Sequence, residues 1–458
     1  MREVPIRIPT GGKHVKVTML GEREEKLGGI AGSENDKRMM QDRLCSVQCS
    51  LPAGTAQSPT KKVILVGVRI SSCYTRKKHF TLETNKRTSM NQRFFPWVML
   101  PILLLLAGCP NGGGGNGGFG DAAPSGVVIS PNGSFLYVSN RGLDSVSAYT
   151  IGGGGALTPI TGSPFPAGTS PSAVTISPNG SFLYVSNRES DNVSAYTIEG
   201  TGALTPVTGS PFQAGTNPSA VTVSPNGSFL YVSNQGSNNV SAYTITAGTG
   251  VLVPLTPGVG NPFAVGTSPS ALTISSNGSF LYVSNQGSNN VSAYTITTGT
   301  GVLASVAGSP FAAGTSPSGV TVSPNDAFLY VSNQGSNNVS AYTITAGTGV
   351  LASVAGSPFP AETNPSAVTV SPNGSFLYVS NQGSNNVSAY TITAGTGVLV
   401  PLIPGVGNPF AAGTSPSALT ISSNGSFLYV SNQGSNNVSA YTITTGTGVL
   451  ASVAGSPF

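Results

Sequence analysis

Five charged residues in two neighbouring repeats could do hydrolytic chemistry. Asp144, Glu189 and Asp191 lie in corresponding loops, beside Arg141 and Arg188. A carboxylate can act as a general base on water, and an Arg guanidinium can bind an anionic substrate or stabilise an oxyanion. The alternative is a set of solvated loop charges, because charged side chains are mostly exposed. These residues are therefore weak candidates for a catalytic site.

The other residues of this region offer little chemistry. From Gly126 to Phe458 the chain has no His, Cys or Lys, and its charged residues are two Arg and six acids. No Walker-type loop occurs, and no Lys follows the Gly-rich run at residues 111–118, so this run is not a phosphate-binding loop. We therefore expect no cofactor and no metal.

Amides recur in five loops that share the sequence Asn-Gln-Gly-Ser-Asn-Asn. If corresponding loops lie on one face of the fold, their side chains form a ring of donors and acceptors that suits glycans or the backbone of another protein. The alternative is that Asn, Gly and Ser are simply the residues that turns require. The candidate residues of this binding face are Asn234, Asn238, Asn285, Asn289, Asn333, Asn337, Asn381, Asn385, Asn432 and Asn436.

A sequence repeat positions all of these residues. The string Phe-Leu-Tyr-Val-Ser-Asn occurs seven times in residues 126–458, about every 48 residues. Periods of about 40–50 residues with several strands per unit are typical of propeller blades. Residues 217–311 and 364–458 differ from each other at only two positions. Such similar blades cannot supply the different residues that an asymmetric catalytic site needs.

The third repeat indicates the strands of each blade. Runs of β-branched and aromatic residues predict strands over 220–223, 229–233, 240–245 and 251–253. An Asn-Gly pair between the first two runs is a strong hairpin signal. The sequence therefore predicts an all-β fold, a seven-bladed β-propeller of four-stranded antiparallel blades over residues 126–458. The alternative is a parallel β-helix, although its coils are shorter than these repeats.

A segment before the repeats has the layout of a secretory signal peptide. Residues 90–108 contain one Arg, an apolar stretch of about 15 residues and then small residues. The sequence Leu-Ala-Gly-Cys ending at Cys109 resembles the lipobox of bacterial lipoproteins, which implies that Cys109 is lipid-modified. Residues 109–125 then form a Gly-rich tether. The alternatives are a short buried helix or a transmembrane anchor in which Cys109 has no role.

Residues 1–89 share no repeat with the rest of the chain and hold 17 of its 20 Lys and Arg residues. We interpret them as an over-extended reading frame or a poorly structured, disordered extension, without an assigned function. Cys45 and Cys49, followed by Cys73 and His79, could suggest a zinc site, but the second pair is too loosely spaced for one. Beyond the signal segment acids outnumber basic residues, which disfavours a nucleic-acid partner.

The repeated strings, Ser-Pro-Asn-Gly-Ser-Phe-Leu-Tyr-Val-Ser-Asn and Asn-Val-Ser-Ala-Tyr-Thr-Ile, resemble the YVTN-type repeat and the seven-bladed lactonase family. The resemblance covers residues 126–458 and implies a seven-bladed propeller. The activity that gives the family its name is hydrolysis of 6-phosphogluconolactone. The matching residues are turn formers and core aromatics, and the charged and His residues on which family members depend have no evident counterparts in this sequence.

These observations favour an exported propeller, lipid-anchored at the outer membrane or cell surface, that serves as a binding or structural module. Its expected partners are the membrane, through the lipid anchor, and envelope proteins or glycans. The alternative is a lactone hydrolase that uses the carboxylates of the first two blades.

Overall fold

A computed structural model describes residues 16–17, 49–50, 122–255, 261–402 and 407–458. The chain divides into two units, Met1–Asn111 and Gly112–Phe458. In the first unit, strands β1 (Lys16–Val17) and β2 (Cys49–Ser50) pair antiparallel. The predicted signal peptide, Cys109 and most of the predicted tether lie outside the described residues, as does the rest of the N-terminal extension. In the described part of the chain, no helix is both long and apolar enough to span a bilayer.

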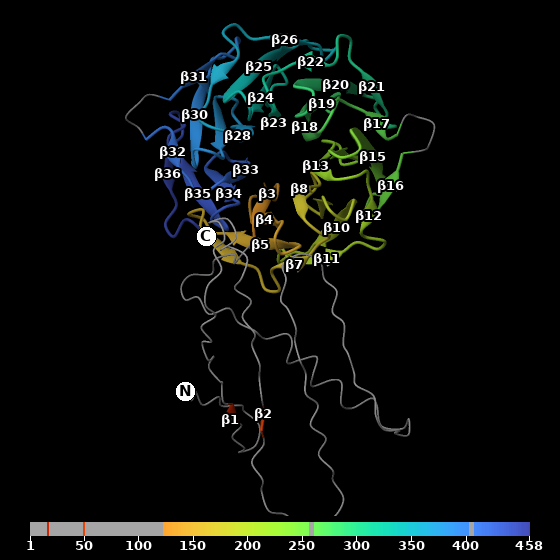
Figure 1. The fold of residues 1–458 in the computed structure, drawn as a ribbon, viewed down its shortest axis with the longest axis vertical. Helices are drawn as coiled ribbons and strands as arrows, with labels where there is room; N and C mark the ends of the chain where they lie inside the picture. Colours follow the sequence, from red (N-terminus) through yellow and green to blue (C-terminus); the bar gives the residue numbers. More distant parts are fainter. Residues whose placement is uncertain (1–15, 18–48, 51–121, 256–260, 403–406) are drawn as a thin grey trace, which may run out of the picture. The chain divides into compact units, whose positions relative to one another are not determined.

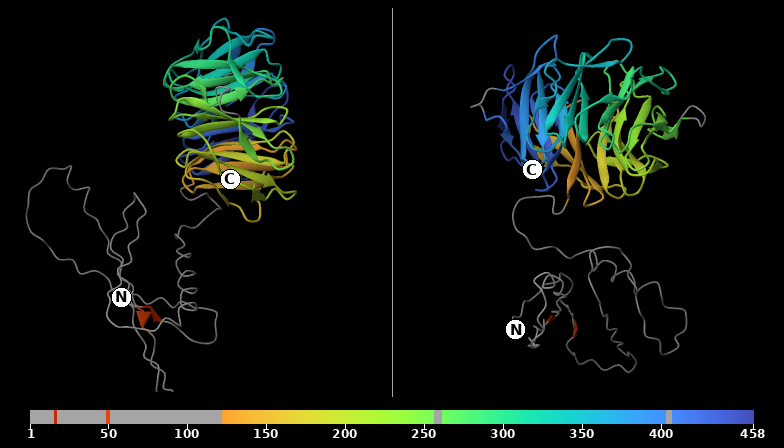
Figure 2. Two further views of the ribbon diagram at one scale, coloured as in Figure 1. Left: turned by 90° about the vertical axis from the view of Figure 1, so that its right-hand side faces the viewer. Right: turned by 45° about the horizontal axis from the view of Figure 1, so that its top comes forward.

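The second unit contains seven antiparallel sheets arranged as a ring (Figure 1), and each sheet is built from one sequence repeat. This confirms the predicted seven-bladed β-propeller. Viewed from the side, the strands run between the two faces of the ring (Figure 2). The first blade begins at Pro124, two residues earlier than the sequence pattern indicated.

The first strand of each blade lies nearest the axis (Figure 1), and the second strand pairs with it. The first strands are β3 (Pro124–Ile129), β8 (Pro171–Ile176), β13 (Pro218–Val223), β18 (Pro269–Ile274), β23 (Pro317–Val322), β28 (Pro365–Val370) and β33 (Pro416–Ile421). The second strands are β4 (Phe135–Asn140), β9 (Phe182–Asn187), β14 (Phe229–Asn234), β19 (Phe280–Asn285), β24 (Phe328–Asn333), β29 (Phe376–Asn381) and β34 (Phe427–Asn432).

The third strand pairs with the second, and a short fourth strand lies at the outer edge. The third strands are β5 (Ser145–Ile151), β10 (Asn192–Ile198), β15 (Asn239–Ile245), β20 (Asn290–Ile296), β25 (Asn338–Ile344), β30 (Asn386–Ile392) and β35 (Asn437–Ile443). The fourth strands are β6 (Leu157–Pro159), β11 (Leu204–Pro206), β16 (Leu252–Pro254), β21 (Leu303–Ser305), β26 (Leu351–Ser353), β31 (Leu399–Pro401) and β36 (Leu450–Ser452).

Six blades also have a two-residue fifth strand, which the sequence pattern did not indicate. These strands are β7 (Phe165–Pro166), β12 (Phe212–Gln213), β17 (Phe263–Ala264), β22 (Phe311–Ala312), β27 (Phe359–Pro360) and β32 (Phe410–Ala411). Each pairs with the start of the third strand, as Phe165 does with Val146. In the seventh blade, Phe458 exchanges both backbone hydrogen bonds with Val438, at 2.8 Å each.

The turn between the first two strands follows the chemistry of its residues. In the third blade, the Asn226 side chain accepts hydrogen bonds from the Ser224 hydroxyl at 2.6 Å and from the Ser228 amide at 3.0 Å. Gly227 follows with a φ of 73°, which Gly adopts without steric cost. We call the face that carries these turns the Asn-Gly face. The opposite face carries the loops between the second and third strands, such as 141–144, and we call it the Arg face.

The hydrophobic core lies between neighbouring blades. One cluster joins Tyr184 and Val193 of the second blade to Leu230, Val232 and Tyr243 of the third. The Tyr residue in the middle of each second strand is completely buried, and its hydroxyl donates to a Gly carbonyl of the next blade at 2.8–3.1 Å. Each buried Tyr hydroxyl therefore has a hydrogen-bond partner, as is usual for buried tyrosines.

The same contacts close the ring between the seventh and first blades. Tyr429 donates to the carbonyl of Gly155 at 2.8 Å. Near the axis, a Ser hydroxyl of each first strand donates to a Pro carbonyl of the next blade at 2.7–2.9 Å, and the Ser417 hydroxyl completes this circle at Pro124. Each blade is a continuous piece of chain, so side-chain hydrogen bonds and apolar packing hold the ring closed without a strand exchanged between its ends.

Candidate functional site

Two of the three carboxylates suggested by the sequence connect neighbouring blades. The Asp144 side chain accepts a hydrogen bond from the backbone N–H of Ser170, and that of Asp191 accepts one from Asn217, both at 2.8 Å. Both Asp residues have φ near +50°, in the left-handed region that Asp and Asn tolerate best among residues with a side chain. Their carboxylate oxygens therefore bind the backbone just before the first strand of the next blade.

In the other five blades Asn residues make the same connection. Each side-chain oxygen accepts a hydrogen bond from a backbone N–H of the next blade at 2.7–2.9 Å, and Asn436 closes the circle at Ala123. The residues are Asn238, Asn289, Asn337, Asn385 and Asn436. Asp144 and Asp191 thus occupy a position where a neutral amide makes the same bond, which favours a structural role for both carboxylates.

The other five Asn residues of the expected binding face lie in the interior. Asn234, Asn285, Asn333, Asn381 and Asn432 have no exposed surface. Each side-chain NH₂ donates to the third strand of its own blade, as Asn234 does to Asn239 at 2.8 Å and to Ser241 at 2.9 Å. The structure therefore corrects the expectation that these amides form an exposed ring, because buried polar groups need partners within the protein.

The position after each second strand carries the polar groups that the structure brings together on the Arg face. Arg188 donates to the side-chain carbonyl of Gln235 at 2.5 Å. Gln235, Gln286 and Gln334 each donate to the corresponding Gln of the next blade at 3.1–3.3 Å, and the chain of bonds ends at Gln382. Every donor points in the same direction around the axis, so the bonds polarise one another. Arg141 and Gln433 hold the same position in the first and seventh blades.

The two Arg residues were predicted as site residues from their charge, whereas these Gln residues were not predicted. A signal was present, because aligned repeats have Arg in two blades and Gln in five at this position. Gln looks like an ordinary turn residue in a single repeat. Only the ring brings equivalent positions within hydrogen-bonding distance.

Arg141, Arg188 and Glu189 form an electrostatic group at this position. Burial lowers the pKa of the Arg141 guanidinium, the charge of Arg188 lowers it further, and the carboxylate of Glu189 raises it. The Nε–H of Arg141 is buried and has no hydrogen-bond partner among the described residues. Glu189 is exposed, and no described residue donates a hydrogen bond to its carboxylate. The group thus has a free carboxylate beside two half-buried cations.

The remaining acids of the propeller lie elsewhere. On the Asn-Gly face, the Asp326 carboxylate accepts hydrogen bonds from the backbone N–H groups of Ser276 at 2.5 Å and Asn277 at 2.9 Å. Glu199 lines a pocket on that face, and Glu362 is exposed in a connection between blades. Among the described residues, no three His, Cys, Asp or Glu side chains are grouped so that they could hold a metal ion.

Solved structures share this fold at low sequence identity. A candidate 6-phosphogluconolactonase from Bacteroides fragilis is 21% identical with a TM-score of 0.55, over 72% of this chain and 93% of that one. The periplasmic gluconolactonase of Pseudomonas aeruginosa is 21% identical with a TM-score of 0.51, over 64% and 86%. Virginiamycin B lyase from Staphylococcus aureus is 18% identical with a TM-score of 0.50, over 70% and 94%. Because these proteins carry different activities, the likeness shows the fold alone.

Sequence comparison gives the family. A search of curated proteins found no match. The family model described as lactonase, seven-bladed β-propeller, matches four overlapping segments, residues 113–165, 158–265, 256–362 and 352–457. These segments together include every blade, each with the strand order and inter-blade contacts described above. The chain therefore belongs to the seven-bladed β-propeller lactonase family.

Proposed function

We propose that the protein hydrolyses an anionic sugar lactone on the Arg face, with Arg141 and Arg188 binding the anion and Glu189 acting as general base. The observation that supports this most strongly is the free carboxylate of Glu189 beside two half-buried guanidinium groups. Family membership also favours lactone hydrolysis over the binding or structural module that we expected from the sequence.

The charges of this group suit such a substrate. Guanidinium groups bind phosphate or carboxylate through charge-assisted hydrogen bonds, which are about twice as strong as neutral ones. The buried Nε–H of Arg141 is a donor without a partner among the described residues. Gln433, at the equivalent position of the adjacent seventh blade, carries an amide that can both donate to and accept from sugar hydroxyls.

The proposed reaction requires one proton acceptor. Glu189 takes a proton from water as the water oxygen bonds to the lactone carbonyl carbon. The carbonyl oxygen becomes negative in the tetrahedral intermediate, and a neighbouring guanidinium stabilises it. The ring C–O bond then breaks, and the proton held by Glu189 passes to the departing ring oxygen. The product is the open hydroxy acid, which loses its carboxyl proton to water.

The first test measures hydrolysis of 6-phosphogluconolactone and of unphosphorylated gluconolactone by the full chain, corrected for the spontaneous rate. Glu189→Gln should lower kcat by about 10²–10⁴-fold, the usual contribution of a general base. Glu362→Gln is the matched control, because it removes one exposed carboxylate from a loop on the same face. Equal rates in both variants would exclude Glu189 as the base.

A second pair of variants tests the anion site. Arg188→Gln and Arg141→Gln introduce the residue that five other blades carry at this position, so the fold should persist. We expect each to raise KM for the phosphorylated lactone more than for the neutral one. Binding of both lactones without turnover above background would instead support a binding module.

The export of the protein remains a proposal. Residues 90–108 and Cys109 support a lipid anchor at the outer membrane or cell surface, with envelope proteins or glycans as neighbours. Metabolic labelling with a fatty acid, in the chain with and without Cys109→Ala, tests this. Label retained in the variant would contradict lipidation at Cys109.

A further inference from the structure

A second feature of the molecule lies on the Asn-Gly face, away from the Arg group. The loop between the third and fourth strands of each blade covers the first Phe of the second strand in the preceding blade. In the third blade this loop spans six residues, and Gly250 lies directly over Phe182. Phe182, Phe229, Phe280, Phe328 and Phe376 are accordingly buried, with 4–5% of their surface exposed.

The first two blades have a loop that is one residue shorter, as the strand bounds show. The Phe residues under these two loops are Phe427 and Phe135, and both are only half-buried. Shortening the loop therefore uncovers part of an aromatic ring that is buried in the other five interfaces. Between the first and second blades, the uncovered Phe135 lines a pocket of about 290 Å³.

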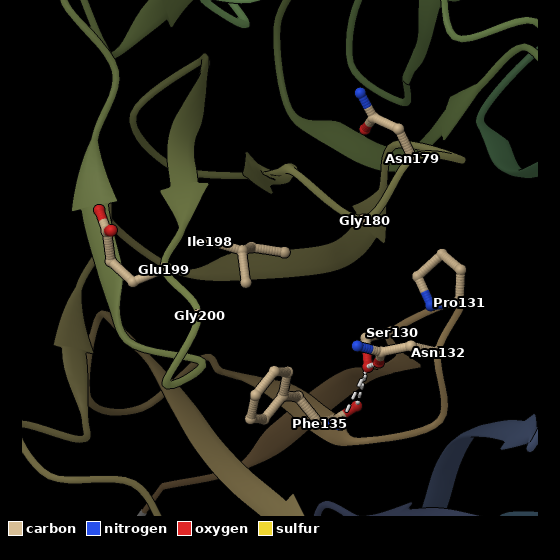
Figure 3. Close-up of a pocket in the computed structure, with 9 residues that line it drawn as sticks. All are labelled: Ser130, Pro131, Asn132, Phe135, Asn179, Gly180, Ile198, Glu199 and Gly200. Carbon is tan, nitrogen blue, oxygen red and sulfur yellow. Dashed lines mark hydrogen bonds between the residues drawn. The ribbon is translucent and has the colours of Figure 1, made fainter.

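Polar groups surround this aromatic surface. Figure 3 shows Glu199 on one side of the pocket and Asn132 and Asn179 on the other, with Ile198 and Phe135 between them. The side-chain oxygen of Asn132 accepts hydrogen bonds from Ser130 at 2.6 Å and from the Ser134 amide at 3.0 Å, and Asn179 is held in the same way. Both amides therefore hold their NH₂ groups in a fixed orientation.

The pocket thus combines two oriented donors, a carboxylate acceptor and an apolar ring. Among the described residues, nothing donates a hydrogen bond to the Glu199 carboxylate. A pyranose sugar has the complementary chemistry, because its C–H face packs on an aromatic ring and its hydroxyls both donate and accept. A volume of about 290 Å³ is at the lower limit for ligand pockets, which suits a single sugar unit.

Charge separates this pocket from the Arg group. Its one ionisable side chain is Glu199, which disfavours an anionic ligand. Asn132 lies just before β4 begins at Phe135, and Arg141 follows its end at Asn140. A strand of six residues is about 20 Å long, so the two groups lie at opposite ends of the blade.

We propose that the pocket between the first and second blades is a binding site for one neutral hexopyranose unit, held by Glu199, Asn132, Asn179 and the exposed part of Phe135. The site is independent of lactone hydrolysis.

The test measures binding of methyl α- and β-hexopyranosides (glucose, galactose and mannose) to the full chain by saturation-transfer NMR. Glu199→Thr introduces the residue that begins this loop in the other five blades, so the fold should be retained. We expect binding of at least one glycoside and at least a tenfold weaker affinity in Glu199→Thr. Phe135→Ala should abolish binding, whereas Phe427→Ala, at the half-buried Phe under the other short loop, should not.

Three results would overturn the proposal. The first is no saturation transfer to any glycoside at tens of millimolar. The second is transfer that Glu199→Thr leaves unchanged, because the signal then arises elsewhere. The third is selective binding of tetramethylammonium, which would make the carboxylate and Phe135 a cation site instead.

Discussion

Replacing Tyr429 by Phe removes a single hydroxyl from the interface that closes the ring. That hydroxyl donates to the carbonyl of Gly155 at 2.8 Å, from the last blade to the first. Burial raises the pKa of Tyr429, so the hydroxyl is protonated at neutral pH and can donate. Phe keeps the aromatic ring and its place in the apolar cluster that includes Val453 and Leu136. The substitution therefore isolates one hydrogen bond of the closure.

The expected cost follows from the burial of this bond. An ordinary intramolecular hydrogen bond contributes about 0.5–1.5 kcal/mol, and a buried group left without a partner costs about 1–3 kcal/mol. In the variant the Gly155 carbonyl would stay buried but would lose the hydroxyl that donates a hydrogen bond to it. We therefore expect Tyr429→Phe to lower the free energy of unfolding by about 2 kcal/mol.

The propeller provides a matched control. Tyr282 donates to Gly349 at 3.0 Å, between two blades that are consecutive in the chain. If the ring is closed, Tyr282→Phe and Tyr429→Phe should cost the same within about 0.5 kcal/mol. Urea unfolding of the full chain, followed by circular dichroism, measures both. A cost near zero for Tyr429→Phe, with a cost of about 2 kcal/mol for Tyr282→Phe, would refute closure through the first and seventh blades.

Three further predictions concern the buried polar groups. Burial raises the pKa of Tyr149, Tyr243 and Tyr390 to about 12, so these propeller tyrosines should not contribute to a titration near pH 10 followed by absorbance at 295 nm. Because the pKa of each tyrosine is higher in the folded protein than in the unfolded chain, the protonated hydroxyls contribute fully to stability below pH 10. This contribution should be lost as the pH rises toward 12, and the Tm should fall. Asp144→Asn should leave the Tm unchanged and Asp144→Ala should lower it, since Asn makes the same inter-blade bond elsewhere; a large loss of activity in Asp144→Asn would contradict this role. Asn285→Ala should lower the free energy of unfolding in urea by about 2 kcal/mol, because it leaves buried polar groups without their hydrogen-bond partner. An unchanged free energy of unfolding would contradict the interior position of Asn285.

The strands could be predicted from the repeat because each blade is specified by local chemistry. Phe229–Asn234 is rich in aromatic and β-branched residues, and Asn226 and Gly227 form the turn before it from their own side-chain and backbone preferences. The short fifth strands were missed. Two residues such as Phe263–Ala264 carry no periodicity, and their pairing with β15 depends on where the connecting segment returns.

The candidate site was predicted only in part. Arg141, Arg188 and Glu189 were recognised by charge, and the structure places them together. The Gln residues that extend from Arg188 were not recognised, because their hydrogen bonds join positions about 48 residues apart. The amide of Asn234 was expected on the surface, since a polar residue in a turn-like sequence is usually exposed. Its partners, Asn239 and Ser241, make it part of the interior.

The sequence alone determined the number of blades, the order of their strands and the absence of His, Cys and Lys from the propeller, because these depend on composition and on preferences within about ten residues of chain. The tertiary structure decided how the ring closes, which carboxylates accept hydrogen bonds from backbone N–H groups and which aromatic rings are left partly exposed. Each of these is a contact between neighbouring blades, and no repeat considered by itself contains both partners.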